Sequence, residues 1–302
     1  MLYDIEKIGT KRIRVDRIAI CVFLIIIVFL TIFAGIRCAI TVQNENYAKQ
    51  LEVTAKSIEE ERLKQEAKEQ EEKAKKEGPL SQEQIQAVEN IYTSDTKRVF
   101  LTFDDGPSKA VTPFILDLLK QENIKATFFV LGDRVVANPE LVKRAYEEGH
   151  FIANHGKTHV YKQIYSSPQA VLEEYNYTQQ VIRDAIGNQN YYCRVFRFPG
   201  GSKGGYYSSI KNEALALLHQ NGIASLDWNS LSRDAEGAKT KEELLQNVIT
   251  TMGTKNSVVI LMHDANNKIL TYESLPDIIQ YLRQNGYTFC TLQDVIDSAA
   301  DS

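Results

Sequence analysis

From about residue 96 the chain alternates between short apolar runs and stretches with the periodicity of an amphipathic helix. Such alternation is typical of a parallel sheet whose strands are joined by covering helices. The pattern repeats about seven times, so we expect an α/β fold, an irregular (β/α) barrel of about seven parallel strands, closed or nearly closed, in residues 96–302. The apolar runs are residues 99–103, 126–131, 151–153, 195–198, 223–226, 258–262 and 287–292. The helical patterns cover residues 113–121, 139–148, 168–185, 208–220, 241–251 and 275–284.

The N-terminal part of the chain carries a long apolar segment. Residues 18–36 contain no charged side chain and are long enough to cross a bilayer. The segment is preceded by the basic residues Lys7, Lys11, Arg12, Arg14 and Arg17. Because basic residues stay on the cytoplasmic side, we expect residues 1–17 in the cytoplasm, a single transmembrane anchor at 18–36 in the cell membrane, and an extracellular folded domain. A cleaved signal peptide is the alternative, although the run exceeds a typical signal core and Ile36-Arg37-Cys38 is a poor cleavage site.

A charged linker, residues 37–95, separates this segment from the expected barrel. Its central part, residues 43–79, is rich in Glu, Lys, Gln and Ala, which favour helix and can pair at i, i+4. Apolar positions are too sparse for a long coiled-coil seam, so a solvated helical or flexible stalk is favoured over one that drives oligomerisation. With a net charge of −4 the chain has no bulk positive field, and we expect no nucleic-acid partner.

Cysteines are few in this chain. Of the 4, Cys193 and Cys290 fall in the barrel region, each beside an expected strand. An exported chain can oxidise such a pair to a disulfide, but two buried free thiols are the favoured interpretation. No Cys-x-x-Cys spacing occurs, so the sequence offers no cysteine-based metal motif.

Two adjacent acids, Asp104 and Asp105, follow the first expected strand in the motif TFDDGPS, residues 102–108. Side chains on a strand alternate between faces, so the two carboxylates should face apart, one towards a cation and one towards a substrate. Asp-Gly-Pro is also ordinary turn chemistry, which is the simpler interpretation of these residues alone. The functional interpretation therefore requires cation ligands at other strand ends.

His155 and His159 follow the third expected strand with an i, i+4 spacing. This spacing would place both imidazoles on one face of a helical turn, a common way to hold Zn²⁺. Two histidines and one carboxylate give three ligands and leave a position for water, which is typical of a catalytic rather than a structural zinc site. His150 and His219 lack such companions and are interpreted as structural.

Three further strand ends carry chemically capable residues. Arg197 precedes Pro199-Gly200-Gly201, where glycine lets backbone N–H groups approach a ligand. The only tryptophan, Trp228, follows the next expected strand, and a strongly apolar strand ends at His263. In (β/α) barrels the active groups lie at the carboxyl ends of the strands, so these residues should meet the acids and histidines in one site.

These five stretches in this order resemble the polysaccharide deacetylases of carbohydrate esterase family 4, the group related to nodulation-factor chitooligosaccharide deacetylase. The resemblance covers about residues 97–298 and is carried above all by Thr-Phe-Asp-Asp-Gly, His-x-x-x-His and the late Leu-x-His. Within the family, the chain is most similar to membrane-anchored peptidoglycan N-acetylglucosamine deacetylases. The resemblance implies a metal-dependent hydrolase that removes N-acetyl groups from N-acetylglucosamine in cell-wall peptidoglycan and releases acetate.

The resemblance also implies a role for each matching residue. Asp105, His155 and His159 correspond to the metal ligands, with Zn²⁺ expected and Co²⁺, Ni²⁺ or Mn²⁺ open. The implied catalytic residues are Asp104 as general base, Arg197 as its orienting partner, His263 as general acid and Asp234 as the acid that raises the pKa of this histidine. The implied substrate-binding residues are Leu261 at the acetyl methyl, the backbone N–H near Gly200 at the oxyanion, and Pro199 and Trp228 along the groove.

Two alternatives to this function stay open. The same site could act as an O-acetyl esterase on xylan or another acetylated polysaccharide, or the chain could be a non-catalytic wall-binding protein with a retained metal site. Departures from the family pattern bear on substrate class and rate. Gly156 stands where Ser or Thr is usual, and Leu231-Ser232-Arg233-Asp234-Ala235 stands where the family has Asp-x-x-Asp-Trp. Trp228 is the only residue that could replace the missing indole.

Overall fold

The computed structural model describes the backbone of residues 5–300 and the side chains of Arg17, residues 19–68 and residues 78–300. The chain divides into two compact units, Met1–Glu72 and Lys73–Ser302. The basic side chains before Arg17, on which the expected membrane orientation depends, lie outside the described side chains.

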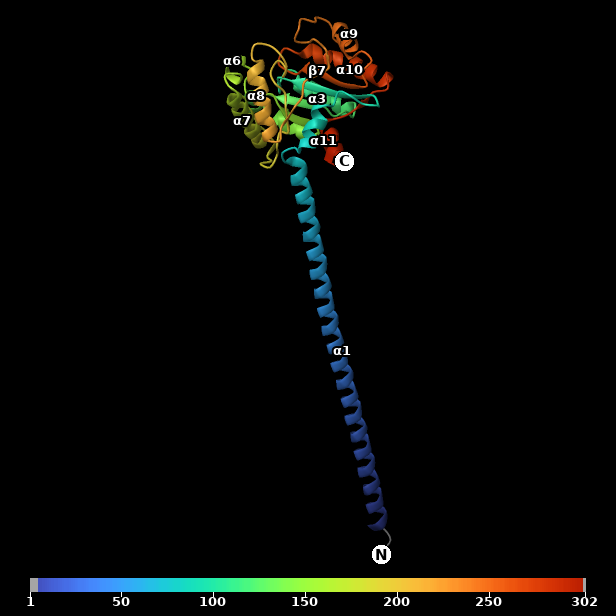
Figure 1. Cartoon of the computed structure of the whole chain (residues 1–302). Helices are drawn as coiled ribbons and strands as arrows, with labels where there is room; N and C mark the ends of the chain where they lie inside the picture. The colour runs from blue at the N-terminus through green and yellow to red at the C-terminus, as the bar shows by residue number, and fades with distance from the viewer. Residues whose placement is uncertain (1–4, 301–302) are drawn as a thin grey trace. The chain divides into compact units, whose positions relative to one another are not determined.

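The first unit is formed by the long helix α1, Ile5–Glu77 (Figure 1). Its apolar part lies within Ala19–Lys68, where the mean hydropathy of the most apolar window reaches 3.1 and none of that window is buried. By length and composition this helix can cross a membrane, and a signal sequence near the N-terminus would show the same pattern. The anchor at residues 18–36 therefore stays a prediction.

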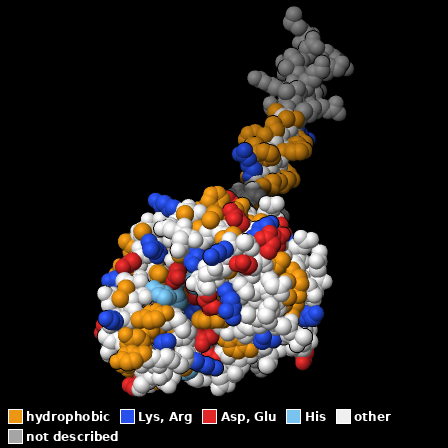
Figure 2. Space-filling model, turned by 90° about the horizontal axis from the view of Figure 1, so that it is seen from above, with side chains coloured by type: hydrophobic (Ala, Val, Ile, Leu, Met, Phe, Trp, Pro, Cys, Tyr) orange, Lys and Arg blue, Asp and Glu red, His pale blue; other side chains and the backbone are white. Residues whose placement is uncertain are grey.

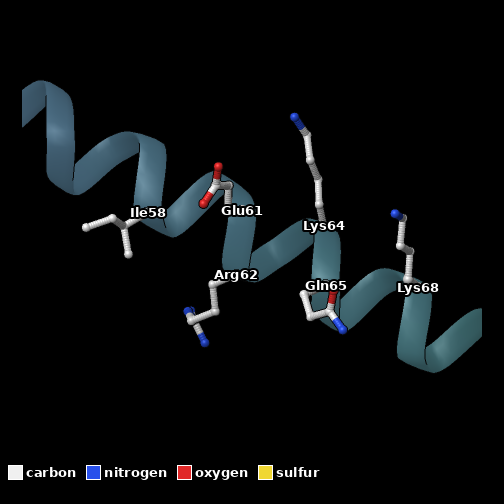
Figure 3. A pocket seen from close by; sticks show the side chains of 6 residues that line it. All are labelled: Ile58, Glu61, Arg62, Lys64, Gln65 and Lys68. Atoms are coloured by element: carbon white, nitrogen blue, oxygen red, sulfur yellow. The ribbon is translucent and has the colours of Figure 1, made fainter.

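The charged part of α1 is a regular helix rather than a flexible spacer. Arg62 pairs with Glu59 at 2.6 Å and with Glu66 at 2.7 Å, one turn away on either side. Figure 3 shows neighbouring side chains that project from this single helix, so the shallow hollow among them is bounded by one element only. Exposed ion pairs of this kind contribute little to stability, and this stretch encloses no binding site.

Seven parallel strands form the sheet of the second unit in the order β5-β4-β3-β2-β1-β7-β6, and the short β8 pairs with β1. The sheet curls into a half-barrel, which stays open between β5 and β6 in the described part of the chain. The expected α/β fold is confirmed, while the open edge and strand β6 are new. The strands are β1 Arg98–Asp104, β2 Thr127–Val130, β3 Phe151–Asn154, β4 Val195–Phe196, β5 Ala224–Ser225, β6 Ser230–Leu231, β7 Ser257–His263 and β8 Thr288–Phe289.

Helices connect the strands and cover the convex face of the sheet. In Figure 1, α6, α7 and α8 lie on one side of the strands and α9 and α10 on the other. Ser167 starts the longest of these connections, because its side chain accepts a hydrogen bond from Ala170 N–H and Pro168 follows it. The helices of this unit are α2 Gln82–Glu89, α3 Thr112–Gln121, α4 Gly132–Ala137, α5 Pro139–Glu147, α6 Tyr161–Ile164, α7 Pro168–Ile186, α8 Ser208–Gln220, α9 Lys241–Met252, α10 Ile269–Gln284 and α11 Leu292–Ala300.

Side chains along each strand alternate between two apolar clusters. Leu101 and Phe103 belong to the outer cluster beneath the covering helices, whereas Phe100 belongs to the inner cluster with residues of α2 and α11. The period of two places Asp104 on the same inner face as Phe100. The same period places His263 on the inner face of β7. The inner face is therefore apolar where α2 and α11 fill it and becomes polar at its carboxyl end.

Helix α2 lies within the stretch that was expected to be stalk. Ser81 and Gln84 form a capping box at its start. Its apolar side chains, including Ile85 and Val88, are buried in the inner cluster. The folded unit therefore begins near Leu80 and not at the expected residue 96, because α2 covers apolar surface inside the half-barrel.

The C-terminal segment also differs from its expected structure. Only Thr288–Phe289 of the apolar run 287–292 pairs as a strand, and Leu292 begins α11. Leu292 and Ile296 are spaced by one helical turn and both lie fully buried, so the run continues as an amphipathic helix. Cys193 and Cys290 are free thiols in the structure; Cys193 is buried as expected, whereas Cys290 is only half-buried.

Candidate active site

Charged side chains gather at the carboxyl ends of the inner strands. Asp104 ends β1 and is followed by Asp105, while His155 follows β3 and His263 ends β7. Figure 2 shows histidine side chains beside acidic ones on a hollowed face of the molecule. The fold thus brings together residues that the sequence placed at separate strand ends.

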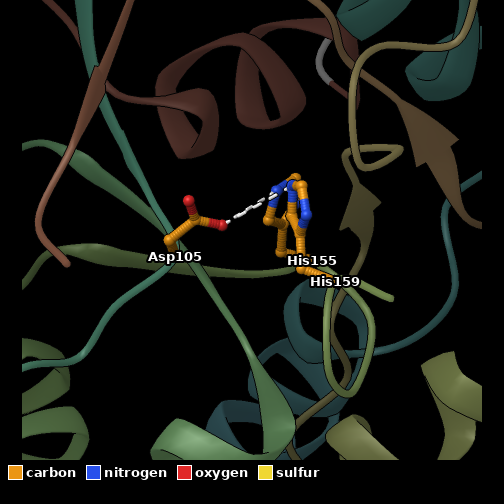
Figure 4. A group of neighbouring side chains, drawn as sticks. All are labelled: Asp105, His155 and His159. Atoms are coloured by element: carbon orange, nitrogen blue, oxygen red, sulfur yellow. Dashed lines mark ion pairs between the residues drawn. The ribbon is translucent and has the colours of Figure 1, made fainter. Parts of the chain in front are cut away.

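Asp105, His155 and His159 form a cluster that could hold a metal ion (Figure 4). Oδ1 of Asp105 lies 3.6 Å from Nε2 of His155 and 3.8 Å from Nε2 of His159. Tetrahedral zinc ligands at about 2.1 Å from the ion lie about 3.4 Å from one another, so these spacings fit a divalent cation. Oδ1 of Asp105 is also buried and has no hydrogen-bond partner among the described residues. A bound cation would satisfy this atom.

The orientation of His155 suits a metal ligand. Its Nδ1 lies 2.8 Å from the backbone oxygen of Arg197, which can only accept, so Nδ1–H donates and Nε2 presents its lone pair to Asp105. Burial lowers the pKa of His155 to about 3, against the opposing charge of Asp105. The imidazole is therefore neutral at physiological pH, which is the form that binds metal.

The loop that carries the two histidines is not the helical turn that their i, i+4 spacing predicted. No helix is assigned between β3 and α6, and Gly156 and His159 have φ angles of 81° and 63°. Asp105 also has a left-handed φ, 71°. A left-handed backbone costs roughly 1–3 kcal/mol at a residue other than glycine and is typical of sites where geometry is imposed by function.

The two adjacent acids do not simply face apart as strand alternation predicted. Asp105 lies beyond β1 in a left-handed conformation, so the alternation ends at Asp104. Oδ2 of Asp104 lies 3.7 Å from Nε2 of His155, and Oδ1 of Asp105 lies 3.6 Å from the same atom. Both carboxylates therefore approach the metal cluster, and they differ in their other contacts.

Arg197 holds the other oxygen of Asp104. Its Nη1 donates to Asp104 Oδ1 at 2.7 Å and its Nε donates to Leu226 O at 2.9 Å. The guanidinium is fully buried and stacks over Phe129, with Cζ 3.9 Å from the ring centroid. Burial raises the pKa of Asp104, and the charge of Arg197 works in the opposite direction. The pair fixes one carboxylate oxygen and leaves Oδ2 towards the metal cluster.

His263 forms a second pair with Asp234. Its Nδ1 lies 2.8 Å from Asp234 Oδ1, and its backbone N–H donates to Oδ2 at 2.8 Å. Thr271 donates a further hydrogen bond to Oδ2 at 2.7 Å. Burial lowers the pKa of His263, but the hydrogen bond and charge of Asp234 outweigh it and raise the pKa to about 9. Burial opposes ionisation of Asp234, yet the hydrogen bonds from His263 and Thr271 hold its pKa below the usual value.

The expected substrate-binding residues lie around these pairs. Leu261 precedes His263 by two residues on β7 and so shares its face. Pro199 O accepts from Tyr165 Oη at 2.7 Å, which fixes the loop after β4. Gly200 has a φ of 76°, and a Cβ there would lie 2.4 Å from the hydroxyl of Tyr161, so any other residue would be strained and would displace this side chain. The Trp228 ring centroid lies 5.8 Å from Arg197 Cζ.

Two residues of this region escaped the sequence reasoning. The ring of Tyr161 lies 5.3 Å from that of His159 and forms an aromatic wall beside the metal cluster. Asp264 is buried, and its carboxylate accepts a hydrogen bond from Thr112 Oγ1 at 2.5 Å. The carboxylate also packs against Gly106, where a Cβ would lie 2.1 Å from its Oδ2. Burial raises the pKa of Asp264 to about 7. Its position next to His263 was the only sequence signal for it.

The departure at Gly156 has a structural reason. Its positive φ strains any other residue, and a Cβ there would lie 2.8 Å from Ile164 Cδ1. The bracing that a hydroxyl would supply comes from elsewhere, since Lys157 N–H donates to Glu174 Oε2 at 2.7 Å and Thr178 Oγ1 donates to Gly156 O at 2.9 Å. The loop is therefore fixed without a Ser or Thr at this position.

Residues 92–224 match the sequence profile of the polysaccharide deacetylase family. The peptidoglycan-N-acetylglucosamine deacetylase PgdA of Listeria monocytogenes is 35% identical over 201 residues, which are 66% of this chain and 39% of that protein. This chain thus spans about two fifths of the length of that relative. A peptidoglycan-N-acetylglucosamine deacetylase of Bacillus cereus is 36% identical over 200 residues, 65% of this chain and 69% of that protein.

Solved structures show the same fold. The catalytic domain of the peptidoglycan N-acetylglucosamine deacetylase of Eubacterium rectale matches with a TM-score of 0.60 and 33% identity, over 67% of this chain and 94% of that domain. The matched residues 92–224 include Asp104, Asp105 and the two histidines after β3. Sequence and fold agree that the chain belongs to the polysaccharide deacetylases of carbohydrate esterase family 4.

Proposed function

We propose that this protein is a metal-dependent deacetylase that removes N-acetyl groups from N-acetylglucosamine residues of cell-wall peptidoglycan. One observation carries the proposal. Three side chains that could bind a metal ion lie beside two buried pairs, Asp104 with Arg197 and His263 with Asp234. Amide hydrolysis needs both groups, because water must lose a proton and the leaving amine must gain one.

Asp105, His155 and His159 are the proposed ligands of a divalent cation, with Zn²⁺ the first candidate and Co²⁺, Ni²⁺ or Mn²⁺ the others. A cation at this site supplies Lewis-acid polarisation of the acetamide carbonyl and lowers the pKa of water. The unpartnered oxygen of Asp105 and the neutral imidazole of His155 support this assignment.

Asp104 is the proposed general base. Arg197 occupies its Oδ1, so Oδ2 is the oxygen that accepts a proton as water attacks the carbonyl carbon. The buried guanidinium donates to Asp104 through Nη1, and its other donors fix its own plane by bonding to Leu226 O, Thr102 Oγ1 and Asp227 O. The N–H of Gly200 is the proposed backbone donor to the developing oxyanion, because the N–H of Gly201 already donates to Phe198 O at 2.8 Å.

His263 is the proposed general acid. Its raised pKa, about 9, keeps the imidazolium protonated at neutral pH, and Asp234 fixes its orientation through Nδ1. As the carbon–nitrogen bond breaks, His263 gives its proton to the sugar nitrogen, and acetate and a free amine result. An amine leaves very poorly as an anion, so a proton donor that stays charged at neutral pH favours N-deacetylation over ester hydrolysis.

Four further residues complete the proposed substrate site. Leu261 lines the pocket for the acetyl methyl, while Pro199, Gly200 and Trp228 form the groove wall.

The proposed layout of the chain suits a substrate outside the cell. A cytoplasmic segment at 1–17, an anchor at 18–36 and a stalk that ends before Leu80 would precede the catalytic domain, and peptidoglycan is what the relatives from Listeria and Bacillus are named for.

The test is acetate release by the full chain in detergent micelles. Purified peptidoglycan, chitooligosaccharides and acetylated xylan are compared, each with a chelator and after addition of Zn²⁺. We expect metal-dependent acetate and new free amines from peptidoglycan. Acetate from xylan alone would point to an ester substrate. No acetate from any polymer, with one metal ion bound per chain, would favour a non-catalytic wall-binding protein.

A further inference from the structure

The half-barrel is open between β5 and β6, and a hollow of about 460 Å³ lies at this edge. We call it the edge hollow. Its walls come from the end of α2, the loop after Gly201 and the segment Asp227–Asn229. Its volume lies in the range of about 300–1,000 Å³ that is usual for small-molecule sites.

Two aromatic side chains line the edge hollow. Tyr92 and Trp228 are both half-buried, so each ring keeps an exposed part towards the hollow. Gly201 lies close to the Trp228 ring, since a Cβ at this position would lie 3.3 Å from it. Aromatic rings that present an apolar face in a polar cleft suit the apolar face of a sugar ring.

The polar groups of the edge hollow suit a neutral ligand. Ser225 is 8% exposed, and its hydroxyl has no hydrogen-bond partner among the described residues. Asp227 accepts from Ser202 Oγ at 2.6 Å and keeps further lone pairs for a ligand hydroxyl. Burial, helped by the charge of Asp227, raises the pKa of Tyr92 to about 12, so its hydroxyl stays neutral. The lining also contains Glu89 and Lys203, and Glu89 is already paired with Nε2 of His219 and accepts a hydrogen bond from Ser225 N–H.

We propose that the edge hollow binds one N-acetylhexosamine unit of the glycan chain, beside the sugar that is deacetylated. Arg197 links the two places, because its Nη1 donates to Asp104 and its Nη2 donates to Asp227 O at 3.1 Å. A sugar on Trp228 therefore lies against the same segment that positions the catalytic arginine. The identity of the glycan rests on the proposed function, whereas the binding of a sugar does not require turnover.

The single tryptophan makes a direct test possible. Trp228 is the only tryptophan in the chain, so its emission reports on a ligand that contacts this ring, and a variant of Tyr92 then separates the edge hollow from the catalytic groove. The full chain in detergent micelles is titrated with chitooligosaccharides of two to six units. We expect a saturable change in emission whose affinity increases once the oligomer is long enough to occupy both places.

Tyr92→Ala tests the wall of the edge hollow. We expect roughly three- to tenfold weaker binding of the long oligomers and an equal rise in KM, with kcat within about twofold. Tyr206→Ala is the matched control, because Tyr206 is 94% exposed and does not line the edge hollow. Ser225→Ala removes only the unpartnered hydroxyl and gives a second variant that keeps the packing.

Each outcome decides between the claims. Equal affinities for wild type, Tyr92→Ala and Ser225→Ala would overturn the inference even if acetate is released. An emission change that Tyr92→Ala weakens, without any acetate from the wild type, would keep the sugar site and overturn the proposed function. Displacement of the oligomers by a cell-wall stem peptide that lacks sugar would also overturn the inference, because the edge hollow would then bind peptide.

Discussion

The candidate active site contains two buried acids that each hold a cationic partner, and the partners differ. Asp104 lies 2.7 Å from Arg197, whose guanidinium does not titrate in proteins. Asp234 lies 2.8 Å from His263, whose pKa is raised to about 9. The Asp104–Arg197 pair can gain or lose a proton only at the carboxylate, whereas the Asp234–His263 pair does so at the imidazole. In the proposed mechanism, a buried ion pair thus serves the base, Asp104, in one place and the acid, His263, in the other.

The hydrogen bonds of the two acids show the same division. Asp234 accepts from His263 N–H, His263 Nδ1 and Thr271 Oγ1, so both of its oxygens are occupied. Asp104 gives one oxygen to Arg197, and the other lies towards His155. The fully bonded acid can orient its partner but has little capacity for a proton. The partly bonded acid keeps an oxygen for the reaction.

Asp104→Asn removes the proposed base and should have the largest effect. We expect acetate release to fall by at least about 10³-fold, because the amide cannot accept the proton of water. Asp105, His155 and His159 are untouched, so the bound metal should stay near one ion per chain by elemental analysis. Normal turnover in this variant would show that Asp104 is not the base.

Asp234→Asn tests the second pair and should lower kcat by roughly 10²-fold. Loss of the carboxylate also removes the charge that raises the pKa of His263. The proposed general acid, His263, must be protonated, so activity is lost as pH rises through its pKa. This pKa is about 9 without a metal ion, and the positive charge of a bound cation lowers it in the active enzyme. The alkaline limb of the kcat profile should therefore move to lower pH in Asp234→Asn. An unmoved limb would assign it to another group.

Arg197→Lys separates orientation from titration. Lysine keeps the charge but loses the planar donors that bind Asp104, Leu226 and Asp227 together, so we expect about tenfold lower kcat. The alkaline limb should stay where it is, because the substitution keeps a positive charge at residue 197 and leaves the contact between His263 and Asp234 unchanged. Metal affinity should also stay unchanged, since His155 bonds to the backbone oxygen of residue 197. Melting temperature serves as the control for folding.

Much of this comparison was predictable from the sequence. The period of two, the carboxyl ends of the strands and the residue types placed Asp104, His155 and His263 in one site. The pairing of Arg197 with Asp104 came from family resemblance, because no local pattern links residues that lie on different strands. The fold class was predictable for the same reason as the site, since apolar runs and helical periods alternate regularly.

Other features depend on contacts that a local pattern does not contain. The left-handed turns at Asp105 and His159 replace the strand alternation and helical turn that spacing suggested. Helix α2 is short and lies in a charged region, and only its packing inside the half-barrel reveals it. Strand β6 has only two residues, which are too few to show an alternating pattern in the sequence. Tyr161 lies beside His159 because of the way the loop after β3 folds, and no local pattern predicts that.

The smallest expected effect concerns stability and distinguishes the pairs without any substrate. The folded pKa of His263, about 9, lies above its ordinary value of 6.5, so the folded state favours the protonated form. This contribution, about 3 kcal/mol, is fully present below pH 6.5 and is lost as pH rises through about 9. Arg197 gives no such loss over this range, because it stays charged.

Urea unfolding of the chelator-treated full chain between pH 6 and 10 measures this difference. The wild type should lose stability across that range, whereas His263→Asn should lose much less, because asparagine does not titrate. Arg197→Lys should be less stable at every pH yet keep the wild-type slope. Parallel slopes for wild type and His263→Asn would mean that Asp234 does not hold a protonated histidine, and the division of the two buried pairs into a base and an acid would fail with it.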